Sequence, residues 1–505
     1  MKPAPLKQRL SGKALAWLCV AALLMSLLPL YTLSFYNHAS YSDLGYAILT
    51  HDVWREGGGW GELIRAALES TAGSRQTMEG SYAASFLSLL QPALTGGRLY
   101  WVTTILLLSF FLLSLHFFLR QMLVRVLKAD GPTYWMAFCS VAFVMIQFVP
   151  ELSEAFFWFN GGVAYTLMWS FMVLRLGVWV RLSYARTRWG KLGLGTLMVL
   201  LTVIVGGAKY ATLLLALLVE TAMVVWAFWK KRSDRWFSLA VALLLAACCI
   251  FSAMAPGNQL RGAMLPADVS APEALFQSVF LGIALMGNWF SLPLLVVWAL
   301  VAWQLSEALH GSPFRFSHPV WITVLSLSLF CAQLIPAIID GQYLSDGRML
   351  NTCFYTFVLM GCVLVLYWMG WVMRQRERRT GFAAIGTAKK DGLRIAAFAV
   401  ALVLLVVACV SFQPEDISRR GMGNMSAVSA LRSLITGEAQ AYDEAMRQRD
   451  AALNDPGQPE VVLEIIPEIP EAFMDDALEG ENLDEILRLL TEYYEKQRVS
   501  MADGE

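Results

Sequence analysis

Carboxylates in the polar segment that follows the first apolar run are the first candidates for chemistry. Asp43 lies in Tyr-Ser-Asp-Leu-Gly-Tyr, and Glu79 lies in Met-Glu-Gly-Ser-Tyr-Ala-Ala. A carboxylate can act as a general base, because it accepts the proton of a hydroxyl group as that hydroxyl attacks a carbon atom. We expect Asp43 to be such a base and Glu79 to support it. Other acids compete for the role, namely Asp52, Glu151 and Glu154.

Three isolated cations form a second group of candidates. Lys209 lies in Gly-Gly-Ala-Lys-Tyr, Arg261 follows Ala-Pro-Gly-Asn-Gln-Leu, and Arg348 lies in Ser-Asp-Gly-Arg-Met-Leu-Asn. A charge near hydrocarbon costs about 2–3 kcal/mol at a helix centre, so such residues are usually paired or functional. A phosphate or diphosphate would bind all three, because Arg holds its oxygens bidentately. The alternatives are that they reach the lipid headgroups or pair with Asp340 and Asp346.

Aromatic and amide side chains form a third group. Trp158 lies in Phe-Phe-Trp-Phe-Asn, and an indole face can stack on a sugar ring, although Trp and Tyr also gather at the interfaces of any membrane protein. Tyr82 and Asn258 are further substrate-binding candidates. The eight cysteines show neither a CxxC pair nor a Cys/His spacing typical of metal sites, so we interpret them as packing residues.

The elements that must position these residues are membrane-spanning helices. Of the 505 residues, 57% are hydrophobic and 15% are charged, which is typical of a multi-pass membrane protein. An apolar run of about 20 residues can cross about 30 Å of hydrocarbon. We predict about eleven such runs, one of them in a region, 273–306, that is too long for one simple span. The runs cover 14–35, 98–119, 133–150, 161–181, 192–208, 211–229, 236–255, 284–305, 319–339, 350–373 and 393–412.

Lys and Arg gather in alternate connections, which predicts the orientation of the chain. With eleven spans, the basic segments all fall on one side, and an excess of Lys and Arg marks the cytoplasmic side. The amino terminus is then cytoplasmic, and the first long loop, 36–97, is extracytoplasmic together with the carboxyl terminus. The basic segments are the amino terminus, 120–128, 181–191, 230–235 and 374–394.

The segment 413–505 differs from the predicted transmembrane domain, 1–412. It holds 21 Asp and Glu against 8 Lys and Arg, whereas the rest of the chain holds 18 against 31. The residue pattern predicts helices over 432–453 and 483–497 and a short strand over 460–466. We expect a small extracytoplasmic α/β segment, and a partly ordered tail is the alternative.

Several short motifs resemble those of an uncharacterised family of bacterial multi-pass membrane proteins. That family resembles the GT-C superfamily of glycosyltransferases, which use polyprenyl-phosphate sugars. The first helix, the long outward loop with an early Asp and the number of spans also resemble that superfamily. The motifs are Ser-Asp-Leu-Gly-Tyr at 42–46, Glu-Gly-Ser-Tyr-Ala-Ala at 79–84, Phe-Trp-Phe at 157–159, Gly-Gly-Ala-Lys-Tyr at 206–210, Ala-Pro-Gly-Asn at 255–258 and Gly-Arg-Met-Leu-Asn at 347–351.

The resemblance implies a GT-C-like fold and inversion at the anomeric carbon, with a polyprenyl-phosphate sugar as the donor. The base in the first outward loop of these enzymes maps onto Asp43. Many of them carry paired acids there, whereas Ser42 precedes Asp43 in this chain, so we propose no required metal. The expected enzyme lies in a bacterial cytoplasmic membrane and glycosylates a cell-envelope glycan or lipid, with Lys209, Arg261 and Arg348 holding the donor phosphate. No nucleic-acid partner is expected.

Three alternatives stay open. A polysaccharide polymerase or ligase would place its long outward loop in the second half of the chain. A transporter or flippase for lipid-linked sugars would carry an internal repeat and charges deep within its spans, where this chain has few, Arg175 and Glu220 among them. A scaffold that uses the acidic carboxyl-terminal segment would leave the three cations unexplained.

Overall fold

The structure is a computed structural model that describes residues 6–264, 269–340, 347–380, 425–466, 468–474 and 483–502. These residues are predominantly helical, so the predicted all-α polytopic class is confirmed. Nine helical stretches within the described residues are long and apolar enough to cross a membrane. They cover Gly12–Tyr36, Val102–Val126, Phe159–Ser183, Arg188–Gly206, Tyr210–Trp229, Arg235–Ala253, Leu294–Gly311, Pro319–Ile339 and Gly347–Gln375.

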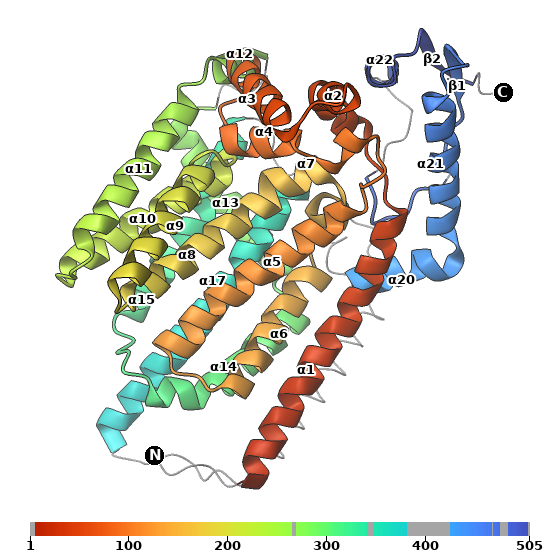
Figure 1. Cartoon of the computed structure of the whole chain (residues 1–505). Helices are drawn as coiled ribbons and strands as arrows, with labels where there is room; N and C mark the ends of the chain where they lie inside the picture. Colours follow the sequence, from red (N-terminus) through yellow and green to blue (C-terminus); the bar gives the residue numbers. More distant parts are fainter. Residues whose placement is uncertain are drawn as a thin grey trace.

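The long helices lie side by side as a tilted bundle (Figure 1). Their first turns follow ordinary capping rules. For example, the Thr187 hydroxyl accepts a hydrogen bond from Gly190 N at the start of α9. The helices are α1 (Leu6–Leu33), α5 (Val102–Arg120), α8 (Met168–Ser183), α9 (Arg188–Gly206), α10 (Tyr210–Trp229), α11 (Arg235–Ala253), α14 (Leu292–Gly311), α15 (Pro319–Ala332) and α17 (Gly347–Thr380).

The helices differ from the predicted spans in two places, and a third predicted span cannot be compared. The run 133–150 forms α6 (Gly131–Gln147), which has only 17 residues and packs against α1 and α14. The prediction of one span over 284–305 is wrong, because Phe290 and Ser291 separate α13 (Ala271–Trp289) from α14. Pro293, at the second position of α14, favours a helix start there. The predicted span 393–412 lies outside the described residues.

Buried aromatic rings hold three helices of the bundle together. Phe111 of α5 stacks on Trp169 of α8, with ring centroids 5.7 Å apart. Both rings pack against Tyr355 of α17, at 4.8 Å and 5.1 Å. Such pairs contribute about 0.5–1.5 kcal/mol each beyond the area they bury. They fix the relative positions of helices whose ends carry candidate residues.

Short helices cover one end of the bundle, at the top of Figure 1. Most of them come from the 36–97 segment, which is therefore folded rather than an open loop. A turn at 57–59, in which Gly57 has a φ of +79°, separates the first two of these helices. The helices are α2 (Tyr41–Arg55), α3 (Trp60–Thr77), α4 (Tyr82–Leu89), the 3₁₀ turn Pro92–Thr95 and α12 (Pro256–Met264).

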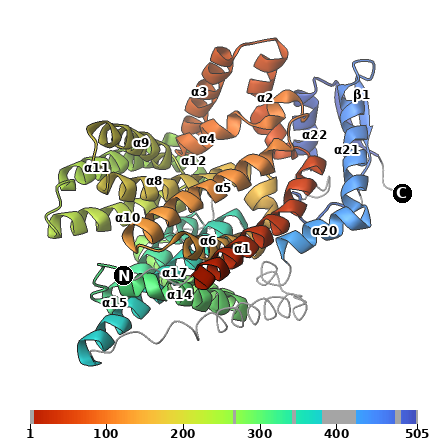
Figure 2. The ribbon, with the colours of Figure 1, turned by 60° about the horizontal axis from the view of Figure 1, so that its bottom comes forward.

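The carboxyl-terminal segment forms a small α/β module on the same face as α2, as both views show (Figures 1 and 2). Its two strands are parallel, with Val461 opposite Val499. Arg55 of α2 pairs with Glu495 at 2.7 Å, and the Tyr493 hydroxyl donates to the carbonyl of Ala93 at 2.6 Å. The predicted helix 432–453 is divided by Gly437, whose φ is +85°. The elements are α20 (Ser426–Thr436), α21 (Glu438–Asn454), β1 (Glu460–Leu463), α22 (Leu483–Tyr493) and β2 (Arg498–Met501).

Candidate functional site

A cavity of about 650 Å³ lies where the covering helices meet the end of the bundle. Its wall is built by α2, α4, α10, α12, α17, the short helix α16 (Ile335–Ile339) and the segment 158–165. A volume of this size is typical of a small-molecule site. Six of the eight residues predicted from the sequence line it, and Asp43 and Tyr82 do not. The six are Glu79, Trp158, Lys209, Asn258, Arg261 and Arg348.

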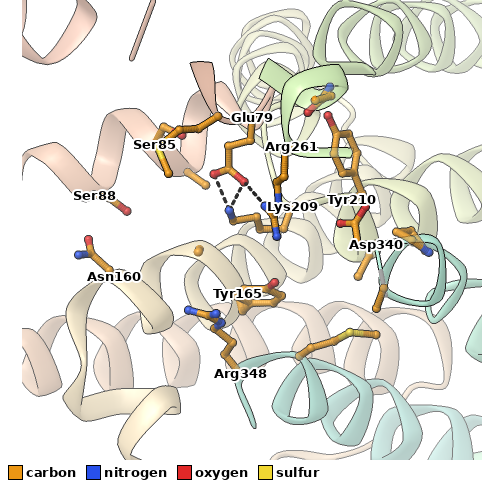
Figure 3. A pocket seen from close by; sticks show the side chains of 18 of the residues that line it. Glu79, Ser85, Ser88, Asn160, Tyr165, Lys209, Tyr210, Arg261, Asp340 and Arg348 are labelled. Carbon is orange, nitrogen blue, oxygen red and sulfur yellow. Dashed lines mark hydrogen bonds and ion pairs between the residues drawn. The ribbon is translucent and has the colours of Figure 1, made fainter. Parts of the chain in front are cut away.

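Glu79 and two of the cations form one ion cluster in this wall (Figure 3). The Lys209 ammonium donates to both carboxylate oxygens of Glu79, and Arg261 Nη1 lies 3.5 Å from Glu79 Oε2. The Glu79 side chain is only 14% exposed. Burial alone would raise the pKa of Glu79, but the charges and hydrogen bonds of its partners, Lys209 foremost, outweigh burial and lower that pKa. Glu79 is therefore ionised at neutral pH and is a weak proton acceptor.

The position of Glu79 is set by the glycine that follows it. A methyl group on Gly80 would lie 1.9 Å from the carbonyl oxygen of Ser252, so only glycine fits. The Ser252 hydroxyl donates to the Gly80 carbonyl at 2.7 Å, and Gly80 N donates to Asn258 Oδ1 at 3.1 Å. The Asn258 amide also donates to the carbonyl of Ser252 at 2.9 Å. Asn258 lines the cavity, but its polar atoms hold the turn that carries Glu79.

A similar close approach places Lys209. Helix α9 ends at a Gly-Gly pair, Gly206 and Gly207, before α10 begins. The carbonyl of Gly207 accepts hydrogen bonds from Ala83 N at 3.0 Å and from Ala84 N at 3.1 Å. A methyl group on Gly207 would lie 2.5 Å from Ala83 N. The hydroxyl of Tyr82 donates to the Val203 carbonyl at 2.7 Å. Tyr82 thus ties α4 to α9 beside the cavity, and the structure does not place it in the wall as predicted.

Arg348 belongs to the first turn of α17 and enters the cavity from another side. Its guanidinium carbon lies 5.0 Å from the ring centroid of Trp158 and 5.7 Å from that of Tyr165. Asn351, one turn later, fixes this turn by bonding both backbone groups of Glu151, at 2.8 Å and 2.7 Å. Stacking on two aromatic faces holds the guanidinium in one orientation.

Asp43 lies behind the cavity wall, with none of its surface exposed. Its carboxylate accepts hydrogen bonds from the Tyr100 hydroxyl, from Asn160 N at 3.2 Å and from Ser40 N at 3.3 Å. Burial raises the pKa of Asp43 to about 6, although these hydrogen bonds oppose the shift. Asn160 lines the cavity, so Asp43 holds a wall residue in place. Its role as a base stays a prediction, and this geometry gives an acceptor no direct access to it.

Asp340 is a cavity residue that sequence reasoning considered only as a partner for the cations. It follows α16 and faces the same space as Arg261 and Lys209 (Figure 3). No hydrogen bond or ion pair joins its carboxylate to another described residue at close range. Burial raises its pKa, and the charges of Arg261 and Lys209 only partly offset that effect. A half-buried carboxylate with a raised pKa is suited to accept a proton.

Further polar residues complete the wall. Ser85 and Ser88 come from α4, Asn160 from the turn after Trp158, and Tyr46 from α2. The helical spacing of the two serines, downstream of Glu79, is a signal that could have identified them. Among the described residues, no group of three His, Cys, Asp or Glu side chains is placed to hold a metal ion.

Comparisons with known proteins give no further identification: no family model, curated protein or solved structure matches this chain.

Proposed function

We propose that the chain is an integral membrane glycosyltransferase that moves a sugar from a polyprenyl-phosphate-linked donor to a cell-envelope glycan or lipid. One observation carries this proposal: Lys209, Arg261 and Arg348, from three distant segments, line one cavity that also holds carboxylates. Cations near a membrane boundary are unfavourable unless they have partners. Glu79 already pairs with Lys209 and Arg261, and the phosphate of a lipid-linked sugar would give these two cations and Arg348 one further common partner.

The position of the cavity supports an extracytoplasmic reaction in a bacterial cytoplasmic membrane. Helix α9 runs from Arg188 to Gly206 beside the cavity, and α10 runs back from Tyr210 to Trp229, just before Lys230. A helix of about 20 residues is about 30 Å long, so the basic connections lie a membrane thickness away from the cavity. An excess of Lys and Arg at that far end favours the cytoplasm there.

The charges in the cavity favour a phosphodiester over a diphosphate. Three cations face two carboxylates, Glu79 and Asp340, which leaves about one unit of positive charge when both acids are ionised. A lipid-phosphate sugar carries one negative charge, whereas a lipid-diphosphate sugar carries two. This balance supports a transferase that uses polyprenyl-phosphate sugars over a polymerase or ligase that uses lipid diphosphates.

The reaction requires one proton acceptor and one stabilised leaving group. An acceptor hydroxyl attacks the anomeric carbon, the bond from that carbon to the phosphate oxygen breaks, and the lipid phosphate leaves with the electron pair. Asp340 takes the hydroxyl proton, because it is the cavity carboxylate without a close partner among the described residues. Arg348, Lys209 and Arg261 stabilise the charge that develops on the phosphate.

A transporter for lipid-linked sugars is the second candidate. Its supporting feature would be ionisable residues within the spans, and the structure has such a pair, Arg175 and Glu220, joined at 2.8 Å. Both side chains are fully buried, and Arg175 also donates to Thr202 at 2.9 Å. A closed, paired arrangement favours a structural role for these residues over a transport pathway.

The proposal is tested by turnover of the purified protein in lipid nanodiscs. The substrates are polyprenyl-phosphate sugars with glucose, galactose, mannose or arabinose, and mass spectrometry measures the released polyprenyl phosphate, including that from slow transfer to water. We expect release with at least one sugar, and its loss in Arg348→Ala. Arg65→Ala is the matched control, because Arg65 is an exposed cation of α3 outside the cavity wall. Equal release from all three proteins would overturn the proposal.

A further inference from the structure

The cavity has a second half that carries almost no charge. In Figure 3, Ser88 and Asn160 lie on one side, Arg261 and Asp340 lie on the other, and Arg348 lies between the two sides. The neutral half is lined by small hydroxyl and amide side chains from α4 and from the turn after Trp158. Its chemistry differs from that of the ion cluster, so it suits a different part of a ligand.

Two polar groups in this half lack protein partners. Asn160 is 6% exposed, and its Oδ1 is buried without a hydrogen-bond partner among the described residues. Ser88 is 5% exposed and lines the cavity, and no hydrogen bond joins its hydroxyl to another described residue. Buried polar atoms are almost always paired, so the unpaired Asn160 Oδ1, with the Ser88 hydroxyl on the same side of the cavity, points to a ligand that pairs with both. Asn160 Oδ1 accepts, and the Ser88 hydroxyl both donates and accepts.

Three contacts make this half of the wall rigid. Asn160 N donates to the buried Asp43 carboxylate at 3.2 Å, which fixes the backbone that carries the amide. The indole N–H of Trp158 donates to the Ser42 hydroxyl at 3.1 Å, which fixes the ring. The Arg348 guanidinium lies over that ring, at the boundary with the charged half. A fixed cation therefore stands beside a fixed pair of neutral hydrogen-bonding groups.

We propose that Ser88 and Asn160 form the subsite for the glycosyl unit of the donor, which they bind through its hydroxyl groups while Arg348 holds the adjoining phosphate. This inference rests on the proposed function and adds to it which end of the cavity holds the glycosyl unit of the donor and which end holds its phosphate. Hydroxyl groups of a sugar supply both the donor that Asn160 needs and the acceptor or donor that Ser88 needs. The anomeric carbon then lies between this subsite and the cations, where Asp340 faces it from the opposite wall.

The test compares two probes of equal charge: farnesyl methyl phosphate and farnesyl-phosphoryl sugars with glucose, galactose, mannose or arabinose. Native mass spectrometry of the full chain in nanodiscs gives both affinities. We expect the wild type to prefer at least one sugar probe by about tenfold. Ser88→Ala and Asn160→Ala should each reduce that preference about fivefold and leave the affinity for the methyl probe unchanged. Ser140→Ala is the control, because Ser140 lies on α6 outside the cavity wall and its hydroxyl already donates to the Met136 carbonyl at 2.9 Å.

The outcomes separate this inference from the proposed function. The absence of any sugar preference in the wild type would overturn the subsite, as would equal weakening of both probes in the Ser88 and Asn160 variants. The proposed function would survive either result if the methyl probe still binds and Arg348→Ala abolishes its binding. If neither probe binds the wild type, both proposals fail. Reduced preference only in the Ser88 and Asn160 variants would support the subsite.

Discussion

Replacing Lys209 by Met should weaken both the folded state and the binding of a lipid phosphate, for two separable reasons. The Lys209 and Glu79 side chains are 23% and 14% exposed, so their ion pair lies between a surface pair and a buried one. Breaking a buried pair costs about 3–5 kcal/mol and breaking an exposed pair about 0–1 kcal/mol. Since Arg261 remains 3.5 Å from Glu79, we expect Lys209→Met to lower the free energy of unfolding by about 1–2 kcal/mol.

The loss of binding has its own magnitude. A hydrogen bond to a charged group contributes about 1.5–3 kcal/mol, and about 1.4 kcal/mol corresponds to a factor of ten in affinity. Lys209→Met should therefore reduce the affinity for farnesyl phosphate about 10- to 100-fold. Native mass spectrometry in nanodiscs measures this affinity, and thermal unfolding followed by tryptophan fluorescence measures the stability.

The double variant Lys209→Met/Glu79→Gln separates the two effects. It removes both charges of the pair, so no unpaired carboxylate remains, and we expect the unfolding temperature to return close to that of the wild type. We expect binding of farnesyl phosphate to stay weak, because the cation is still missing. If the double variant regains wild-type affinity, Lys209 serves only to neutralise Glu79, and the reasoning for an anion site at Lys209 is refuted.

Three further predictions follow from the site. Asp340 accepts a proton only when ionised, and burial raises its pKa, so turnover should fall as the pH drops through that pKa. Asp340→Asn should abolish turnover but keep lipid-phosphate binding, and unchanged turnover would exclude Asp340 as the base. The folded-state pKa of Asp43, about 6, exceeds its unfolded value, so its contribution to stability is complete below about pH 4 and is lost as the pH rises through 6. Unfolding temperatures should therefore show the cost of Asp43→Asn shrinking from pH 4 to 7, and a constant cost would contradict this. Gly80→Ala should push apart the turn that carries Glu79 and the segment from Ser252 to Asn258 that leads to Arg261, and so weaken farnesyl phosphate binding. Gly73→Ala, with open space around it, should leave binding intact.

The convergence of the three cations follows from a rule that sequence alone can apply. The distribution of Lys and Arg predicts that Lys209, Arg261 and Arg348 lie at one membrane boundary, and the structure brings them to one cavity. The positive-inside rule assigns residues to one side of the membrane, but it does not predict which side chains point into a cavity. For this reason Asp340, which follows the short helix α16, was predicted only as a possible partner for the cations.

The roles of Asn258 and Tyr82 depend on backbone groups far away in the chain. The Asn258 amide bonds Gly80, 178 residues earlier, and the Tyr82 hydroxyl bonds Val203, 121 residues later. No local pattern reveals such partners. The capping role of Asp43 did have a local signal, since Ser40 and Asp43 have the spacing of a capping box, in which the acid accepts from the backbone N–H of the N-cap residue.

The fold shows the same division between local and distant causes. Apolar runs predict the long helices, because each run must be long enough to cross hydrocarbon. The region 273–306 was predicted to be too long for one simple span, but the position of the break between α13 and α14 was not predicted, because apolar residues continue through Phe290 and only Pro293 marks the new start. The docking of the carboxyl-terminal module on α2 depends on pairs such as Arg55 and Glu495, which lie 440 residues apart.

The most direct test of the account is a cryo-EM map of the protein in nanodiscs with bound farnesyl-phosphoryl sugar, using the sugar that gives turnover. We predict phosphate density within hydrogen-bond distance of Arg348 and at least one of Lys209 and Arg261. The sugar density should continue toward Ser88 and Asn160. Phosphate density outside this cavity, or a map with an empty cavity at saturating ligand, would contradict the central claim.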